Sequence, residues 1–203
     1  MGWGVNDKET FSYLLEKKIN RPVYNLGVSG YGTIRELIRL QESNLLDKID
    51  TIIIQYCYND YGENVDYKKT SIDIAKKKYE TVKKGSQFSF WKKLRKSFRY
   101  SVTIPKDVLT NKSKSLNFDH HNEAFVEVLK KFPFIIDKKI IVFYVNGHQQ
   151  EFVNFPSGQS KVLNNLEYID LNIEEDINSF YLIDGHLNSS GHVKIADKLS
   201  KLF

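Results

Sequence analysis

Uninterrupted apolar runs alternate with amphipathic stretches along this chain, and the alternation predicts an α/β protein. Two β-branched and aromatic runs, residues 51–56 and 140–145, are typical of parallel strands buried on both faces. Shorter apolar runs at 23–28 and 167–171 predict two further strands. Because helical patterns separate these runs, we expect a parallel sheet with helices on both faces, a three-layer α/β/α sandwich.

Helices are predicted where apolar residues recur three and four positions apart. The first begins at a cap supplied by Asn6 or Asp7 and ends near Asn20. Thr33, with Glu36 three residues later, forms a capping box that opens the second helix. The chain therefore opens with a helix, whereas the first strand of a doubly wound fold lies centrally. The pattern indicates an unusual domain or one whose first strand is missing.

The second half of the chain predicts two more helices. One begins near Asp119 and ends around Phe132, and the last begins near Ser189. The last helix turns an apolar face inward, which consists of Val193, Ala196 and Leu199. Residues from about 62 to 117 are irregular and basic, and they predict an insertion that carries a helix or two. We therefore expect one domain over residues 1–203 that contains this insertion.

The composition agrees with a globular domain and excludes several classes. Hydrophobic residues make up 41% of the 203, which is too many for a disordered chain. Cys57 is the single cysteine, so an internal disulfide framework and a multi-cysteine zinc site are excluded. No apolar run approaches the roughly 20 residues of a membrane span, and no signal peptide is visible. The cytoplasm is the default compartment, and export would follow if the true amino terminus were missing.

The net charge of +5 arises mainly between Lys68 and Lys114, where aromatic residues lie among the cations. Stacking of bases on aromatic rings would suit single-stranded nucleic acid. Several of these aromatics fall at helical spacing, however, which is typical of a helix that docks on the core. We therefore do not expect specific nucleic-acid binding. Contact with anionic glycans or with a membrane surface fits the charge better.

A carboxylate and an imidazole two positions apart, Asp184 and His186, form the sharpest candidate for catalysis. They stand just before the last predicted helix. An aspartate there can accept from one imidazole nitrogen and leave the other nitrogen as a base, as in acyl-transfer triads. The plain alternative is a helix-capping loop with a surface histidine. His192 falls inside the helix, so we expect it to pack or to hydrogen-bond locally.

Two other segments offer donors for an oxyanion. Residues 25–32 supply backbone N–H groups in a tight turn before a helix, and Asn59 places an amide just past the strand at 51–56. The plain alternatives are an ordinary strand-to-helix turn and a turn signal. Ser29 begins a Gly-x-Ser-x-Gly elbow, but a tyrosine replaces the last glycine, so we expect a structural serine. Cys57 has no neighbour that would activate it, which indicates a small buried hydrophobe.

Three segments together resemble one family. Residues 25–30, 57–60 and 184–188 look like blocks II, III and V of the SGNH (GDSL-type) hydrolases, and their order matches. The resemblance covers the chain apart from its basic middle. It implies the flavodoxin-like fold of that family, in which a serine of a Gly-Asp-Ser motif is the nucleophile.

The resemblance also implies a role for each matching residue. Gly30 and Asn59 would be the oxyanion donors, Asp184 the orienter of the imidazole and His186 the base. No metal ion or organic cofactor is implied, and the remaining histidines show no metal-ligand spacing. The implied substrate is a small-molecule or carbohydrate ester.

The chain departs from the family pattern in three places. The Gly-Asp-Ser block is absent, and the expected nucleophile would lie a few residues upstream of Met1. Cys57 stands where block III usually has glycine. The Asp-His spacing is two rather than the commoner three, which is similar to branches that include polysaccharide O-acetyltransferases. The oligomeric state is left undetermined.

We therefore expect an ester hydrolase of the SGNH type that acts on carbohydrate O-acetyl groups and is inactive, or nearly so, without its serine. Two alternatives stay open. The first is a polysaccharide O-acetyltransferase domain. The second is a non-catalytic binding domain that keeps the cleft and has dispensed with the serine.

Overall fold

The centre of the protein is a four-stranded sheet with the strand order β1-β3-β6-β5. Its strands are β1 (Thr51–Tyr56), β3 (Lys139–Tyr144), β6 (Leu166–Ile169) and β5 (Gly158–Gln159). The structure is a computed structural model that describes residues 4–85, 116–117, 119–145, 147, 152–153, 155–182 and 185–203. The predicted α/β class is confirmed.

The register of the sheet confirms the two long strands and corrects other parts of the prediction. β1 pairs in parallel with β3, and β3 in parallel with β6. β5 runs antiparallel to β6, so the sheet is mostly rather than wholly parallel. Residues 23–28 form no strand, because no neighbouring strand of the described chain lies beside them to share hydrogen bonds. A separate parallel pair joins β2 (Leu116–Asn117) to β4 (Phe152–Val153).

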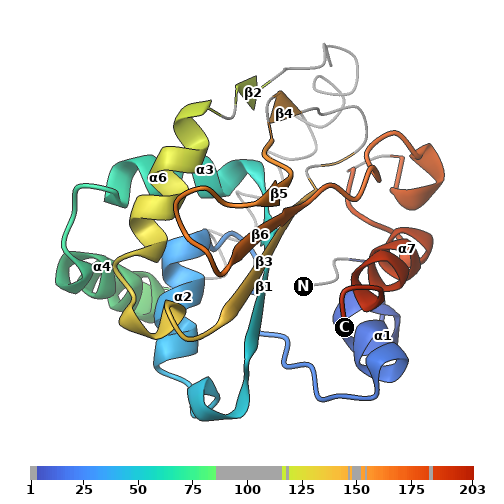
Figure 1. Ribbon diagram of the computed structural model, residues 1–203, viewed down its shortest axis with the longest axis horizontal. Coiled ribbons are helices and arrows are strands. Elements are labelled where there is room, and N and C mark those ends of the chain that lie inside the picture. Colours follow the sequence, from blue (N-terminus) through green and yellow to red (C-terminus); the bar gives the residue numbers. More distant parts are fainter. Residues whose placement is uncertain are drawn as a thin grey trace.

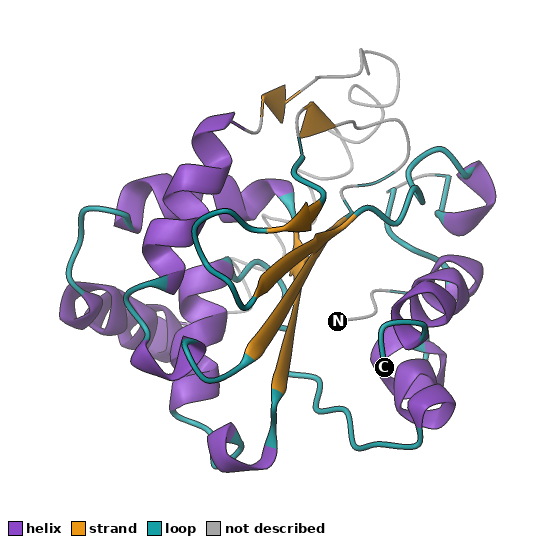
Figure 2. Cartoon of the chain, viewed as in Figure 1, coloured by secondary structure: helices purple, strands orange, loops and turns teal. Residues whose placement is uncertain are grey.

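Helices lie on both sides of the sheet (Figures 1 and 2). One side carries α1 (Phe11–Ile19) and α7 (Ser189–Ser200). The other side carries α2 (Thr33–Gln41), α3 (Tyr58–Tyr67), α4 (Ile72–Gly85) and α6 (Asp119–Leu129). Short 3-10 turns lie at η1 (Asp7–Glu9), η2 (Leu46–Lys48), η3 (Pro133–Ile135) and η4 (Ile177–Ser179).

Alternate residues of β3 build a separate core on each side. Ile140 and Val142 pack with α2 and α6, whereas Ile141 and Phe143 pack with α1 and α7. β3 is buried on both faces, as its uninterrupted apolar run predicts. β1 differs from that prediction, because only alternate residues are buried and the others are partly exposed. The face of β1 toward α1 is therefore incompletely covered.

Several helix ends differ from the sequence expectation. Asn6 caps only the 3-10 turn η1, and α1 begins after Thr10, whose hydroxyl oxygen accepts a hydrogen bond from Tyr13 N. Gly32, not Thr33, is the residue before α2, so the capping box of Thr33 with Glu36 is wrong.

The last helix begins at Ser189 as predicted, but Val193 is 41% exposed and does not face inward. The buried face instead consists of His192, Ile195, Ala196 and Leu199. The buried face of α7 begins at position 192 and therefore includes a histidine. A prediction based on apolar residues alone does not identify this position as buried.

The first part of the expected insertion is helical. The boundary near residue 62 falls inside α3, and α4 covers α2 through the buried side chains of Ala75 and Tyr79. Residues 86–115, with most of the basic and aromatic residues, lie outside the described part of the chain. Among the residues that are described, no helix is both long and apolar enough to cross a membrane.

Candidate functional site

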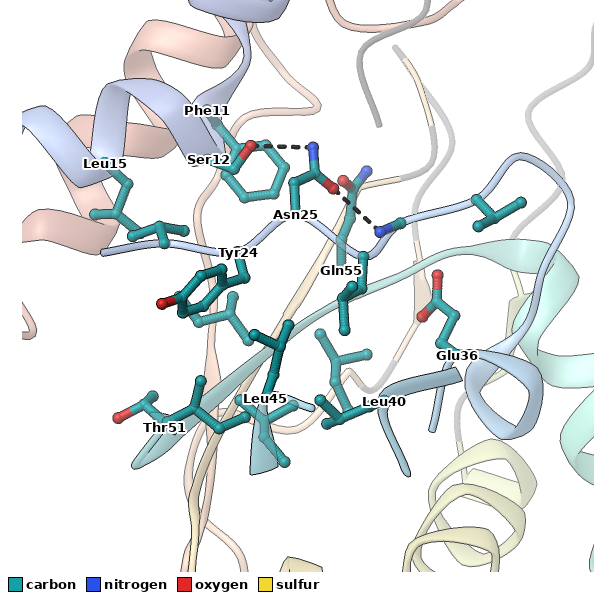
Figure 3. Close-up of a pocket in the computed structure, with 18 of the residues that line it drawn as sticks. Phe11, Ser12, Leu15, Tyr24, Asn25, Glu36, Leu40, Leu45, Thr51 and Gln55 are labelled. Carbon is teal, nitrogen blue, oxygen red and sulfur yellow. Dashed lines mark hydrogen bonds between the residues drawn. The ribbon is translucent and has the colours of Figure 1, made fainter. Parts of the chain in front are cut away.

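A cavity of about 420 Å³ runs along β1, where residues 51–55 line it. Residues 21–31 line its opposite side, and side chains of α1 and α2 line its two flanks. Figure 3 shows Thr51 near one end of the cavity, and Asn25 and Gln55 toward the other. The end beyond Gln55 is the carboxyl end of the strand, where sites form in open α/β sheets.

Three of the four candidate residues from the sequence line this one cavity. Gly30 comes from the turn before α2, Asn59 from the first turn of α3, and His186 from the segment before α7. Asp184 lies outside the described residues. Segments as far apart as residues 30 and 186 therefore converge at the carboxyl end of β1.

Gly30 occupies a tight turn that needs a glycine. Its φ of +73° lies in the left-handed region, which other residues rarely adopt. Its carbonyl oxygen accepts a hydrogen bond of 2.5 Å from the Arg35 guanidinium, which also forms an ion pair of 2.5 Å with Glu63 of α3. The same guanidinium lies 4.7 Å from the ring centre of Tyr31. Because α3 holds Arg35, it also holds the turn that carries Gly30.

Asn59 joins the first turn of α3 to the same loop. Its Nδ2 donates a hydrogen bond of 2.9 Å to the carbonyl oxygen of Tyr31. A side-chain amide has two N–H donors, so one hydrogen remains for a group in the cavity. The bond to Tyr31 fixes the direction of the amide, since Asn59 is otherwise exposed.

His186 is exposed, and its backbone is held by the segment that precedes it. Its carbonyl oxygen accepts a hydrogen bond of 2.8 Å from Tyr181 N. Gly185 before it has a φ of +69°, and Gly147 packs against the Gly185 carbonyl so closely that an added Cβ would lie 3.1 Å from that oxygen. Two glycines thus let the end of β3 approach the histidine segment.

Sequence reasoning missed two carboxyl groups that line the cavity, Glu36 and Asp60. Burial, together with the nearby carboxyl group of Asp60, raises the pKa of Glu36 to about 8. Burial also raises the pKa of Asp60 to about 7, although hydrogen bonds from Cys57 N and the Thr33 hydroxyl, both 2.8 Å, oppose the shift. The sequence contained a signal that position 36 faces inward, because residues at helical spacing on either side of Glu36 face the core.

Two serines and the one cysteine also lie at the cavity. Ser29 is exposed in the turn before Gly30 and lines the cavity. Ser12 of α1 accepts a hydrogen bond of 3.1 Å from the Asn25 amide. Burial raises the pKa of the Cys57 thiol, and Asp60 and Glu36 raise it further. A thiol whose pKa is raised carries little thiolate, so the expectation that Cys57 is unreactive agrees with its surroundings.

His192 lies outside the cavity and has a structural position. It is 2% exposed, stacks on the Phe11 ring, and accepts a hydrogen bond of 3.2 Å at Nδ1 from Phe11 N. The prediction that it packs is confirmed, although its partner is α1 rather than its own helix. Over the described parts of the chain, no three His, Cys, Asp or Glu side chains gather as a metal site would require.

Comparison of this chain with family models, with curated proteins and with solved structures gave no match.

Proposed function

We propose that this domain is the acid–base and oxyanion half of an SGNH-type ester hydrolase, and that its serine nucleophile comes from a segment outside this chain. The observation that carries the proposal is the convergence of Gly30, Asn59 and His186 on one cavity from three distant segments. The sequence places Asp184 two positions before His186, which suits an orienter of the imidazole.

The reaction would proceed by two acyl transfers. The serine oxygen attacks the ester carbonyl while His186 accepts the serine proton, and the carbonyl oxygen becomes an oxyanion. The Gly30 N–H and the second N–H of Asn59 donate to that oxyanion. Its collapse breaks the bond to the alcohol oxygen, which takes the proton from His186. Water, or the hydroxyl of an acceptor, then attacks the acyl-serine in the same way.

The resemblance to the SGNH family favours acetyl esters of carbohydrates as the substrate class. The short Asp-His spacing is similar to branches with O-acetyltransferases, so transfer to a sugar hydroxyl stands beside hydrolysis as the second step. We also propose that the fold is the three-layer α/β/α sandwich of that family without its first strand. The helices on both sides of a mostly parallel sheet support this proposal (Figure 1).

The test is hydrolysis of p-nitrophenyl acetate by three proteins. The first is this chain, the second carries an added amino-terminal apolar strand that ends in Gly-Asp-Ser, and the third has alanine in place of the added serine. We expect activity above the buffer rate only in the second. In that background, Asn59→Ala should lower kcat by about a hundred- to a thousandfold, the range for loss of one oxyanion donor. His186→Ala should abolish the serine-dependent rate.

Two controls separate this proposal from its alternatives. Ser29→Ala should leave the activity of the extended protein unchanged, and Lys130→Ala tests an exposed position away from the cavity. Serine-dependent hydrolysis by the short chain that disappears in Ser29→Ala would assign the nucleophile to Ser29 and contradict the proposal. No activity in any extended form would favour the non-catalytic binding domain.

A further inference from the structure

The outer edge of β1 carries backbone groups that no other described strand pairs with, although the Gln55 carbonyl oxygen accepts a weak hydrogen bond of 3.9 Å from the Cys57 thiol. The carbonyl oxygens of Asp50 and Tyr56 accept hydrogen bonds from β3 and the residue after it, through Lys139 N and Val145 N. Because N–H and C=O of one residue in a parallel strand point to the same side, the even-numbered residues of β1 face β3. The odd-numbered residues therefore face the cavity, and no other strand of the described chain pairs with that edge. They are Thr51, Ile53 and Gln55.

The opposite wall of the cavity also has unpaired backbone groups, at its middle. Residues 22–28 have no regular secondary structure. Among the described residues, the backbone N–H groups of Tyr24, Asn25 and Leu26 donate no hydrogen bond, and neither do their carbonyl oxygens accept one. Two backbone segments with unsatisfied groups thus face each other across the cavity (Figure 3). This is the environment of a central strand in a sheet.

The two flanks of the cavity are apolar. Phe11, Leu15 and Ile19 of α1 line one flank, and Leu37 and Leu40 of α2 line the other. A strand placed between them would bury the side chains of both its faces. Strands buried on both faces are built from continuous Val, Ile and Leu runs rather than from alternating ones.

A partly buried carboxyl group at the cavity is a second, independent observation. Glu36 turns into the cavity (Figure 3), and none of the described residues donates a hydrogen bond to its carboxyl oxygens. A carboxyl group in this position, without a protein donor, can accept further hydrogen bonds from a bound molecule. Backbone N–H groups of an inserted strand would be donors of the required kind.

We propose that this cavity is a slot for an extended apolar peptide strand, which pairs with the outer edge of β1 and with residues 22–28. The length of β1, six residues, sets the length of the occupant at about five or six residues, or roughly 17–20 Å. Such binding is strand addition to a sheet edge, in which main-chain hydrogen bonds supply affinity and side-chain pockets supply selectivity. The inference depends on the geometry of the slot and on no ester chemistry.

The test uses a fluorescein-labelled peptide with the core Val-Ile-Val-Ile-Val and two lysines at each end for solubility. Fluorescence anisotropy with the whole chain should show saturable binding at one peptide per chain. A peptide with the same residues but N-methyl groups at alternate positions cannot donate along one edge, and should bind on the order of tenfold more weakly. Hydrogen exchange at Thr51, Ile53 and Gln55 should slow when the unmodified peptide is bound.

A pair of variants isolates the backbone donor of β1. Ile53→Pro removes one N–H that faces the slot and leaves the bonds to β3, whereas Ile53→Ala shortens the same side chain and keeps the N–H. Ile53→Pro should weaken binding on the order of tenfold relative to Ile53→Ala. If the proline variant does not fold, the exchange measurement on the unaltered chain decides. Equal binding of the N-methylated peptide, or unchanged exchange along β1, would overturn the inference and leave the esterase proposal to its own assay.

Discussion

The Thr33 hydroxyl donates a hydrogen bond of 2.8 Å to Asp60 Oδ1, and so joins the first turn of α2 to the first turn of α3. Both groups are buried, at 0% and 3% exposure. The other oxygen of Asp60 accepts from Cys57 N at the end of β1. One carboxyl group therefore holds together three segments at the carboxyl end of the strand, where Gly30 and Asn59 also lie.

Thr33→Val should test this junction, since valine keeps the shape and removes the donor. We expect the free energy of unfolding to fall by about 1–2 kcal/mol, because a buried carboxyl group loses one of its hydrogen bonds. Chemical denaturation of both proteins at pH 7 measures the difference. Thr70→Val is the matched control, because the Thr70 hydroxyl bonds the Asp66 carbonyl at an exposed position. Equal losses of unfolding free energy in the two variants would show that the hydrogen bond to Asp60 stabilises the protein no more than an exposed one.

Much of the sheet could be predicted because its signal is local. The run at 51–56 matches β1 residue for residue, and the run at 140–145 matches β3 within one position. Continuous β-branched residues are rare outside buried strands, so the residues of these two segments were enough to predict strands. Residues 25–32 were likewise recognisable as a tight turn before a helix, and within that turn Gly30 has a positive φ.

The rest depended on contacts that the local pattern does not contain. Residues 23–28 have strand-like composition but form no strand, because a strand exists only with a neighbour to pair with. Glu36 resembled a helix cap by spacing, yet the helix begins one residue earlier than assumed and turns the acid into the cavity. The pKa of Asp60 depends on its burial and on hydrogen bonds, one of them from Thr33, 27 positions earlier, and no local pattern shows these contacts.

Glu36→Gln should change how stability depends on pH. The pKa of Glu36 is about 8 in the folded protein and near 4.5 when the chain is unfolded. Between these values the folded state binds more protons than the unfolded state, so stability falls as pH rises from about 4.5 to 8. Glutamine stays neutral. We therefore expect the variant to be more stable than the natural sequence at pH 9, by about 1 kcal/mol or more, and similar at pH 4.

Denaturation at several pH values measures this difference. Glu42→Gln is the control, since Glu42 is exposed at the end of the same helix. If the control gains as much stability at pH 9 as Glu36→Gln, the effect arises from net charge and not from burial of Glu36.

His192→Asn should change how stability depends on pH below 7. Burial lowers the pKa of His192 to about 4, below its ordinary value of about 6.5. Between these values the unfolded state binds more protons, so stability is lost as pH falls from about 6.5 toward 4. Asparagine can accept the Phe11 N–H through Oδ1 without titrating. We expect the variant to lose about 1–3 kcal/mol less than the natural sequence between pH 7 and pH 4. The same loss in both proteins would assign the acid sensitivity to other groups.

Gly191→Ala should show how closely α7 approaches the segment before it. An added Cβ at Gly191 would overlap the carbonyl oxygen of Ser179, which already accepts a hydrogen bond of 3.0 Å from Asn188 N. Alanine favours a helix over glycine by about 1 kcal/mol, but forcing an extra carbon into a packed contact costs about 1–3 kcal/mol, and here the obstacle is backbone. We therefore expect net destabilisation in thermal unfolding. Ser190→Ala, one position earlier and exposed, should leave the midpoint nearly unchanged. A Gly191→Ala protein that melts higher than the natural sequence would mean that α7 can shift away from Ser179 without loss.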